Sequence, residues 1–542
     1  MPSSCFCVQD FLREPSEEEW ARLSVYARWM RYFMDSEHAA PSEAALRLLN
    51  ARFSGRCMVP RLRDIRWFDA PPEHLKLMLS LIVSPVLTNF RLGLHAQDTL
   101  DASQVVPVFE ALAPAHGSLV EVRICHHTVH DPQITRAASD LLLKCNPDRI
   151  RTFRVDSSLS TEAFIHATQL PNLETFVIKA DTTELDMQFP TSIFPSLKFL
   201  EIFATNTRSP LLQTIAHIQS SAFTRLELEF PAATLETFLP TMLAALRPRG
   251  LHQTLTMLSI SPEGDFDLDG ATIRPILFLN QLTYLDITLI CAQGRCPYKL
   301  TDENLEELVA AMPKLEVLSL GTFPCAHPAN STIKSLASIA KHCKHLEQLN
   351  IHINAEAIVV RALQDDDREE DSTLEDRLSA FAGCPLLSVI FGPCFIPSEE
   401  QGTMIFVLTL LRLFPRLKSV VVFPPNHERD SLWDLVNTII GVYRRIRINM
   451  ADAGKFTNLP RIRILLMLLQ LLTWKPIEFC ACLLFSLSIR PFPESHLYFI
   501  PPPGSLEPVC TNAQITRQNH GRLMYKRNIK PNPRRFDPRG KH

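Results

Sequence analysis

The segments PNLETFVIKA (residues 171–180) and FPSLKFLEIFA (residues 194–204) share one pattern: a Leu, two residues, an apolar residue, one residue and an Ile. A strand directs alternate side chains to opposite faces, so the last two apolar residues of the pattern share one face. One such unit cannot bury that face alone, and units of this kind therefore stack against their neighbours. The pattern predicts one repeat of a solenoid.

Copies of this pattern recur along most of the chain. The clear copies begin at Leu173, Leu197, Phe223, Leu255, Leu282, Leu315 and Leu346, and weaker copies begin at Leu62, Leu87, Leu119, Ile150, Leu387 and Leu417. Most of the intervals suit a strand followed by a return helix or loop, in repeats of roughly 20–30 residues. In the copy at Leu387, Ile390 takes the second position and Gly392 the third.

The segments between the predicted strands often have helical spacing. Residues 302–311 place Leu305, Leu308 and Val309 on one helix face, after Thr301 as a plausible N-cap. The sequence thus predicts an α/β fold, an irregular leucine-rich-repeat solenoid shaped as a horseshoe, with parallel strands on the concave face and helices on the convex face. An ordinary domain of alternating strands and helices is the alternative. The Asn that often follows this pattern is clear only at Asn354, so other groups must stabilise the turns.

Composition narrows the class of protein. The 542 residues include 16 Gly and 41 Pro, which disfavours Gly-rich phosphate-binding loops. The net charge is −3, but residues 517–542 are basic, so the rest of the chain is acidic and nucleic acid is not the expected partner. No secretory signal opens the sequence, and the 14 Cys suit a reducing compartment. We expect a cytoplasmic or nuclear protein.

Changes in composition divide the chain into segments. The predicted segments are a disordered N-terminus (1–15), a helical cap (16–58), the solenoid (59–450) with an acidic loop (365–377), an apolar helical segment (451–490), and a Pro-rich then basic disordered tail (491–542). Within the apolar segment, Lys475, Pro476 and Glu478 interrupt the run 464–489, so two buried helices are expected there rather than a membrane span.

The cap begins with a capping box, in which Ser16 caps a helix and Glu19 reaches back to it. Trp20, Leu23, Ala27 and Met30 form one stripe of this helix, with Tyr26 and Phe33 beside it, and we expect it to cover the open apolar edge of the first repeat.

The segment EPSEEEWARLSVYARWMRYF (residues 14–33) resembles the helix that follows the F-box in fungal F-box proteins with leucine-rich repeats, especially those of mushroom-forming fungi. The phrases MPKLEVLSLG (residues 312–321) and FPRLKSVVVFPP (residues 414–425) are similar in style to the repeats of that family. The resemblance implies a substrate-recognition subunit of an SCF-type ubiquitin ligase, which binds a Skp-type adaptor and, with it, a cullin. The F-box itself is truncated or absent in this sequence, so a ligase-independent repeat scaffold is the alternative.

Motifs of catalysis and metal binding are weak in this sequence. No phosphate-binding loop, nucleophile elbow or zinc-protease motif is present. The main candidate metal ligands form three groups. The spacing of Cys125, His126, His127 and His130 matches no standard zinc pattern, and His342, Cys343 and His345 end a predicted helix. The pair Cys291 and Cys296 would need two further ligands nearby, and none is evident. We therefore predict a protein that is not an enzyme and needs no metal or cofactor.

A binding face is the more defensible site. In this repeat, the residues beside the second apolar position face the concave surface, and their mix of charged and aromatic types suits a protein interface. The predicted binding residues are Arg154, Asp156, Lys179, Phe199, Glu201, Phe203, Arg225, Glu227, Tyr284, Asp286, Asn350 and His352. We expect a protein substrate on this face, and neither nucleic acid nor membrane. A solvated strand surface without a partner is the alternative.

Overall fold

In the computed structural model, one long parallel sheet organises the described part of the chain. The residues described are 13–34, 42–53, 56–70, 72–94, 101–126, 131–180, 193–204, 215, 217–231, 239–263 without 242, 245 and 249, 266–290, 296–323, 329–355, 384–391, 406–422 without 408 and 412, and 436–445 without 442. The chain divides into two compact units, Met1–Phe456 and Thr457–His542, and every described residue lies in the first.

The sheet has fourteen strands among the described residues, and each strand pairs in parallel with the one before it in the sheet. The strands are β1 (Tyr32–Met34), β2 (Asp64–Ala70), β3 (Asn89–Leu94), β4 (Glu121–Cys125), β5 (Thr152–Val155), β6 (Thr175–Ala180), β7 (Phe199–Ala204), β8 (Arg225–Pro231), β9 (Met257–Glu263), β10 (Tyr284–Ile287), β12 (Val317–Leu320), β14 (Gln348–Ile351), β15 (Ser388–Phe391) and β16 (Ser419–Val422). This order, with helices between many of the consecutive strands in the described ranges, confirms the predicted α/β solenoid.

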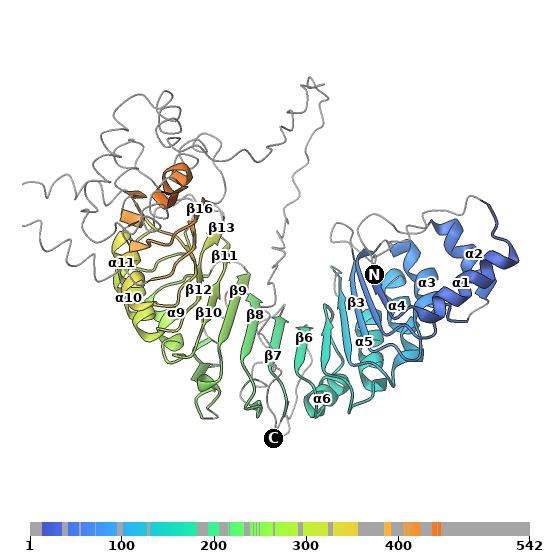
Figure 1. The fold of residues 1–542 in the computed structure, drawn as a ribbon. Coiled ribbons are helices and arrows are strands. Elements are labelled where there is room, and N and C mark those ends of the chain that lie inside the picture. The colour runs from blue at the N-terminus through green and yellow to red at the C-terminus, as the bar shows by residue number, and fades with distance from the viewer. Residues whose placement is uncertain are drawn as a thin grey trace, which may run out of the picture. The chain divides into compact units, whose positions relative to one another are not determined.

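Helices lie along one side of the strands, as Figure 1 shows for α3–α6 and α10–α11. They are α1 (Glu17–Trp29), α2 (Glu43–Phe53), α3 (Pro72–Ile82), α4 (Ala102–Ala111), α5 (Pro132–Lys144), α6 (Thr161–Gln169), α9 (Gly270–Ile273), α10 (Asp302–Ala311) and α11 (Ile333–His342), with 3-10 turns η1 (Ala113–Ala115), η2 (Leu251–Gln253) and η3 (Arg274–Ile276). Their lengths run from four to thirteen residues, so the repeats are irregular as predicted.

The core lies between the sheet and the helices. The second and third apolar positions of each repeat point into it, as Phe176 and Ile178 do on β6, and both are buried. One predicted register is wrong. The buried residues there are Val389 and Phe391 on β15 and Leu386 just before it, because Val389 and Phe391 pair with Leu349 and Ile351 on β14. The pattern fits one residue earlier there, since Phe391 fills a core position that Gly392 would leave empty.

Buried serine hydroxyls contribute to the turns, where few Asn are available. The Ser84 hydroxyl donates to the Leu62 carbonyl at 2.6 Å, and the Ser118 hydroxyl donates to the Leu87 carbonyl at 2.7 Å. Each bond joins one repeat to the preceding one and satisfies a carbonyl that the strands leave unpaired. The backbone N–H of Asn354 donates to the Ser331 carbonyl of the preceding repeat at 2.8 Å.

The N-terminal helix has the predicted capping box: the Glu19 N–H donates to the Ser16 hydroxyl, and the Glu19 carboxylate accepts from the Ser16 N–H. Trp20 and Ala27 are buried as predicted. The rest of the predicted stripe is less buried, because Leu23 is half-buried and Met30 is 39 % exposed, and Tyr26 beside the stripe is 67 % exposed. Residues 32–34 form the edge strand β1, which the sequence does not predict.

A second small sheet pairs β11 (Leu289–Ile290) with β13 (Thr322–Phe323) in parallel. The predicted acidic loop 365–377 and the segments 451–490 and 491–542 lie outside the described residues. None of the helices in the described ranges is long and apolar enough to cross a membrane.

Candidate protein-binding surface

The sheet face away from the helices, which we call the open face, carries one in-register row of side chains. This central row consists of the residues between the second and third apolar positions of each repeat. From β2 to β16 it reads Arg66, Arg91, Arg123, Arg154, Val177, Glu201, Glu227, Ser259, Asp286, Ser319, Asn350, Ile390 and Val421. Parallel pairing therefore places a polar row across much of the sheet.

Most of the predicted binding residues lie on the open face. Arg154, Glu201, Glu227, Asp286 and Asn350 belong to the central row, and on the strands β6–β10 Phe199, Arg225, Tyr284, Lys179 and Phe203 lie two residues to either side of it. Asp156 follows the last residue of β5 and is half-buried.

One predicted binding residue does not line this face. The side chain of His352 is fully buried, and its ring stacks against Tyr298 with 5.6 Å between ring centroids. The prediction is wrong because β14 ends at Ile351, so the alternation that places every second residue on the open face stops before His352.

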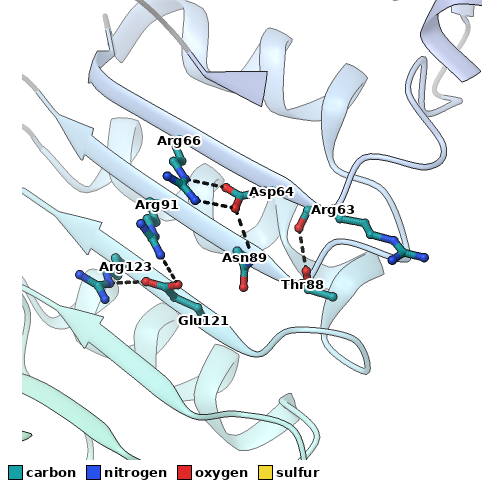
Figure 2. Close-up of polar contacts among 8 residues, drawn as sticks. All are labelled: Arg63, Asp64, Arg66, Thr88, Asn89, Arg91, Glu121 and Arg123. Carbon is teal, nitrogen blue, oxygen red and sulfur yellow. Dashed lines mark hydrogen bonds and ion pairs between the residues drawn. The ribbon is translucent and has the colours of Figure 1, made fainter. Parts of the chain in front are cut away.

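The first four members of the central row are arginines, and we call Arg66, Arg91, Arg123 and Arg154 the basic row. Figure 2 shows three of these side chains on adjacent strands, with their acidic partners beside them. Only Arg154 was predicted. The other three occupy the same position in the weaker repeats that begin at Leu62, Leu87 and Leu119, so reading that position in every repeat would have found them.

Carboxylates on the same strands hold the basic row. Arg66 donates from Nε and Nη2 to the two carboxylate oxygens of Asp64, both at 3.1 Å. The carboxylate of Glu121 is shared: Arg91 Nη2 donates to one oxygen at 2.7 Å, and Arg123 pairs with the other. Charged bonds of this kind fix the planes of the guanidinium groups. The guanidinium groups of Arg91 and Arg123 therefore share the nearly buried carboxylate of Glu121.

Arg154 reaches across β6 to the acidic part of the sheet. Its Nη1 lies 3.2 Å from Oε2 of Glu201 on β7. Val177 is the residue between them in register, and its small apolar side chain is fully buried. Burial lowers the pKa of Arg154, but the charges of Glu201, Cys125 and Asp156 outweigh that effect, so its pKa is raised.

We call Glu201, Glu227 and Asp286 the acidic row. Glu201 is 7 % exposed, and burial raises the pKa of its carboxyl to about 7. Arg154 lowers this pKa, whereas the charges of Glu227, Asp156 and Glu229 raise it further. Asp286 accepts from the Thr288 hydroxyl at 2.9 Å and lies 3.5 Å from the hydroxyls of Ser259 and Tyr284. The carboxyl of Glu201 therefore titrates near neutral pH.

The candidate metal ligands show no assembled site in the described part of the chain, where no group of three or more His, Cys, Asp or Glu is placed to hold an ion. Burial raises the pKa of the Cys125 thiol to about 11 and that of the Cys343 thiol to about 12. His126 is buried, and His127, His130 and Cys291 lie outside the described residues. Thiols with raised pKa values are poor nucleophiles and poor metal ligands.

Comparisons with known proteins identify no family for this chain. No family model matches the sequence, and no curated protein matches it. Among solved structures, the Rad7–Elc1 complex in yeast is similar with a TM-score of 0.38 and 13 % identity, over 76 % of this chain and 89 % of that chain. A protein from Bacteroides fragilis is similar with a TM-score of 0.24 and 14 % identity, over 62 % of this chain and 71 % of that one. Likeness at this level identifies no family, so the fold assignment rests on the strand order and register.

Proposed function

We propose that this protein binds another protein on the open face of its sheet. The observation that carries the proposal is the central row, in which arginines, carboxylates and amides from consecutive strands lie in register on one side of a continuous sheet. Phe199, Phe203 and Tyr284 are half-buried beside this row. Rigid strands that present Arg and aromatic side chains together are typical of protein interfaces.

Within that role, we propose a substrate-recognition subunit of an SCF-type ubiquitin ligase. The support is the resemblance of residues 14–33 and of the repeat phrases to fungal F-box proteins with leucine-rich repeats. In this proposal the open face holds the substrate, and a Skp-type adaptor links the chain to a cullin in the cytoplasm or nucleus. The alternative proposal is a repeat scaffold that works without a ligase.

We further propose that the chain is not an enzyme and uses no cofactor. The titratable groups of the open face are engaged in ion pairs and hydrogen bonds, as Glu121 and Asp286 are. The central row fixes charged groups across the sheet. A fixed pattern of charges favours recognition of a partner surface over catalysis.

Affinity purification followed by mass spectrometry tests the proposal. The tagged protein is compared with a variant that carries Phe199→Ala and Tyr284→Ala, and with a control that carries Arg47→Ala on α2. Loss of a reproducible partner in the open-face variant, with retention in the control, is the expected result. Recovery of a Skp-type adaptor and a cullin supports the ligase role, and their absence beside a retained partner favours the scaffold. A partner that binds all three proteins equally contradicts the open-face proposal.

A further inference from the structure

The end of the open face that contains the basic row also carries exposed apolar side chains. Tyr32 and Met34 on β1 pair in register with Asp64 and Arg66 on β2, so they lie on the same face as the arginines. Phe68 lies two residues beyond Arg66 on β2. Tyr32 is 74 % exposed, Met34 is 67 % exposed and Phe68 is 51 % exposed. We call these three residues the apolar patch.

The arginine side chains of the basic row are more exposed to solvent than the carboxylates that pair with them. The side chains of Arg66, Arg91 and Arg123 are 36 %, 28 % and 42 % exposed, whereas those of Asp64 and Glu121 are 5 % and 11 % exposed. The carboxylates therefore lie beneath the guanidinium groups and orient them, and an approaching molecule meets the cations first. A row built in this way presents N–H donors to an anion without further ordering of the side chains.

We propose that the basic row binds an extended acidic segment of the partner protein, through carboxylate or phosphate groups, and that the apolar patch receives an apolar residue beside that segment. This inference rests on the proposed function and names the chemistry of the partner. Fork-shaped guanidinium groups match carboxylate and phosphate oxygens in pairs, and Arg next to exposed aromatic rings is a frequent composition of interface centres.

The spacing of the row fits a short peptide. Neighbouring strands lie about 4.8 Å apart, so four consecutive arginines span about 14 Å across the sheet. An extended chain covers about 3.4 Å per residue, and about four or five residues therefore match the row. The apolar patch continues from Arg66 onto β1, which places it at one end of that path.

Nucleic acid is the main rival, because cations beside aromatic rings also suit a single strand. The rest of the open face disfavours it. After Arg154 the central row continues to Glu201, Glu227 and Asp286 on β7, β8 and β10, and these carboxylates would repel a longer polyanion. A short acidic segment that spans only the basic row avoids this repulsion.

Fluorescence anisotropy with the full-length protein at about 0.15 M salt tests the inference. The probe is a short fluorescein-labelled peptide rich in Glu with one terminal Phe. A second peptide carries phosphoserine in place of two Glu and distinguishes phosphate from carboxylate as the source of charge. A Lys-rich peptide of the same length and a labelled oligo(dT) are the comparison probes. We expect the acidic peptides to bind, and the Lys-rich peptide and oligo(dT) to bind at least about tenfold more weakly.

The decisive variant carries Arg91→Gln and Arg123→Gln, and its matched control carries Arg47→Gln and Arg151→Gln. The control removes the same charge from two exposed arginines that also pair with a carboxylate but lie outside the strands, on α2 and just before β5. We expect about tenfold weaker peptide binding for the first and less than about twofold change for the control. A variant with Arg91→Lys and Arg123→Lys keeps the charge and loses the fork, and we expect an intermediate affinity for it.

Several results would overturn the inference. These are equal binding by the Gln variant and the control, no acidic-peptide binding by a folded wild-type protein, and tighter binding of oligo(dT). The acidic segment 365–377 of this chain is another possible occupant, so its acids are changed to Asn and Gln in a further variant. A clear gain in peptide affinity there would assign the row to the chain itself and not to a partner. If affinity purification still shows an open-face partner while the peptides fail, only the chemistry inferred here is wrong.

Discussion

The strands β2–β5 and β7–β10 use the same backbone positions for opposite charges. In β2–β5 the central row is made of arginines, and in β7–β10 it contains Glu201, Glu227 and Asp286. The apolar positions do not differ in kind, since Val122 on β4 and Leu226 on β8 are equally buried. The fold thus depends on the buried apolar positions of each strand, and the alternating positions on the open face can differ in charge from one region to the other.

The two regions also differ in how charge is balanced. In the basic region a nearly buried carboxylate lies beneath exposed guanidinium groups, as Glu121 does between Arg91 and Arg123. In the acidic region the buried carboxyl of Glu201 has acids as well as Arg154 for neighbours, and those acids add to the cost of ionising it. Removing a buried carboxylate should therefore have opposite consequences in the two regions.

The largest effect is expected where the regions meet. Phe176 on β6 is fully buried, 6.4 Å from Phe153 and 5.5 Å from Phe194 by ring centroids. Phe176→Ala should lower the free energy of unfolding by about 3–5 kcal/mol. Phe68→Ala, at an exposed ring, should change it by less than about 0.5 kcal/mol. Denaturant unfolding followed by circular dichroism measures both, and two separated transitions in Phe176→Ala would mean that the regions unfold independently.

The next effect concerns the pH dependence of stability. Unfolded Glu201 titrates near its ordinary pKa of 4.5, whereas the pKa in the folded protein is about 7. Between these values the folded state holds a proton that the unfolded state has lost, so this contribution to stability is present below about pH 4.5 and is lost as the pH rises through 7. Glu201→Gln does not titrate. The stability of the wild type relative to this variant should fall by up to about 3 kcal/mol between pH 5 and 8.

Unfolding curves of both proteins at a series of pH values measure this difference. A difference that stays constant between pH 5 and 8 would mean that the pKa of Glu201 is not raised in the folded state. A difference that rises with pH below about pH 5 would mean that Arg154 outweighs burial and holds the carboxyl below its ordinary pKa.

Glu121→Gln should lower the free energy of unfolding, whereas removal of a carboxylate in the acidic region should raise it. It leaves Arg91 and Arg123 close together without the anion between them, and we expect a loss of about 1–3 kcal/mol at neutral pH. Added salt should recover part of the loss, because screening weakens the repulsion between the two exposed cations. An unchanged free energy of unfolding at low salt would show that Glu121 does not hold the row.

The sequence predicts the apolar half of each strand well and the polar half less completely. Burial constrains Phe176 and its counterparts strongly, so their spacing is visible in the residues themselves. The register at β15 was missed because Leu386 and Leu387 both fit the pattern, and only packing chooses between Phe391 and Gly392.

The basic row was missed for a different reason. Arg66, Arg91 and Arg123 occur in the weaker repeats, where the central position has to be taken from the stronger repeats, and their shared row appears once β2, β3 and β4 are paired in register. The burial of His352 is not visible in the pattern, because it depends on β14 ending at Ile351.

The smallest effect should come from the residue beside Glu201 in the acidic row. Glu227 pairs in register with Glu201 on the adjacent strand, and its charge raises the pKa of that carboxyl. Glu227→Gln should therefore lower the pKa of Glu201, so that the pH-dependent loss of stability is smaller and ends at a lower pH. The free energy of unfolding at pH 8 should rise by less than about 1 kcal/mol. The measurement is the same pH series, with Glu201→Gln as background. In that background the effect of Glu227→Gln should shrink, since the repelling partner is gone, and an undiminished effect would mean that Glu227 acts through other groups. Because Glu121→Gln and Glu227→Gln remove the same charge from equally regular strands, opposite signs for the two would establish that the neighbours on the open face, and not the strand itself, decide what a carboxylate contributes.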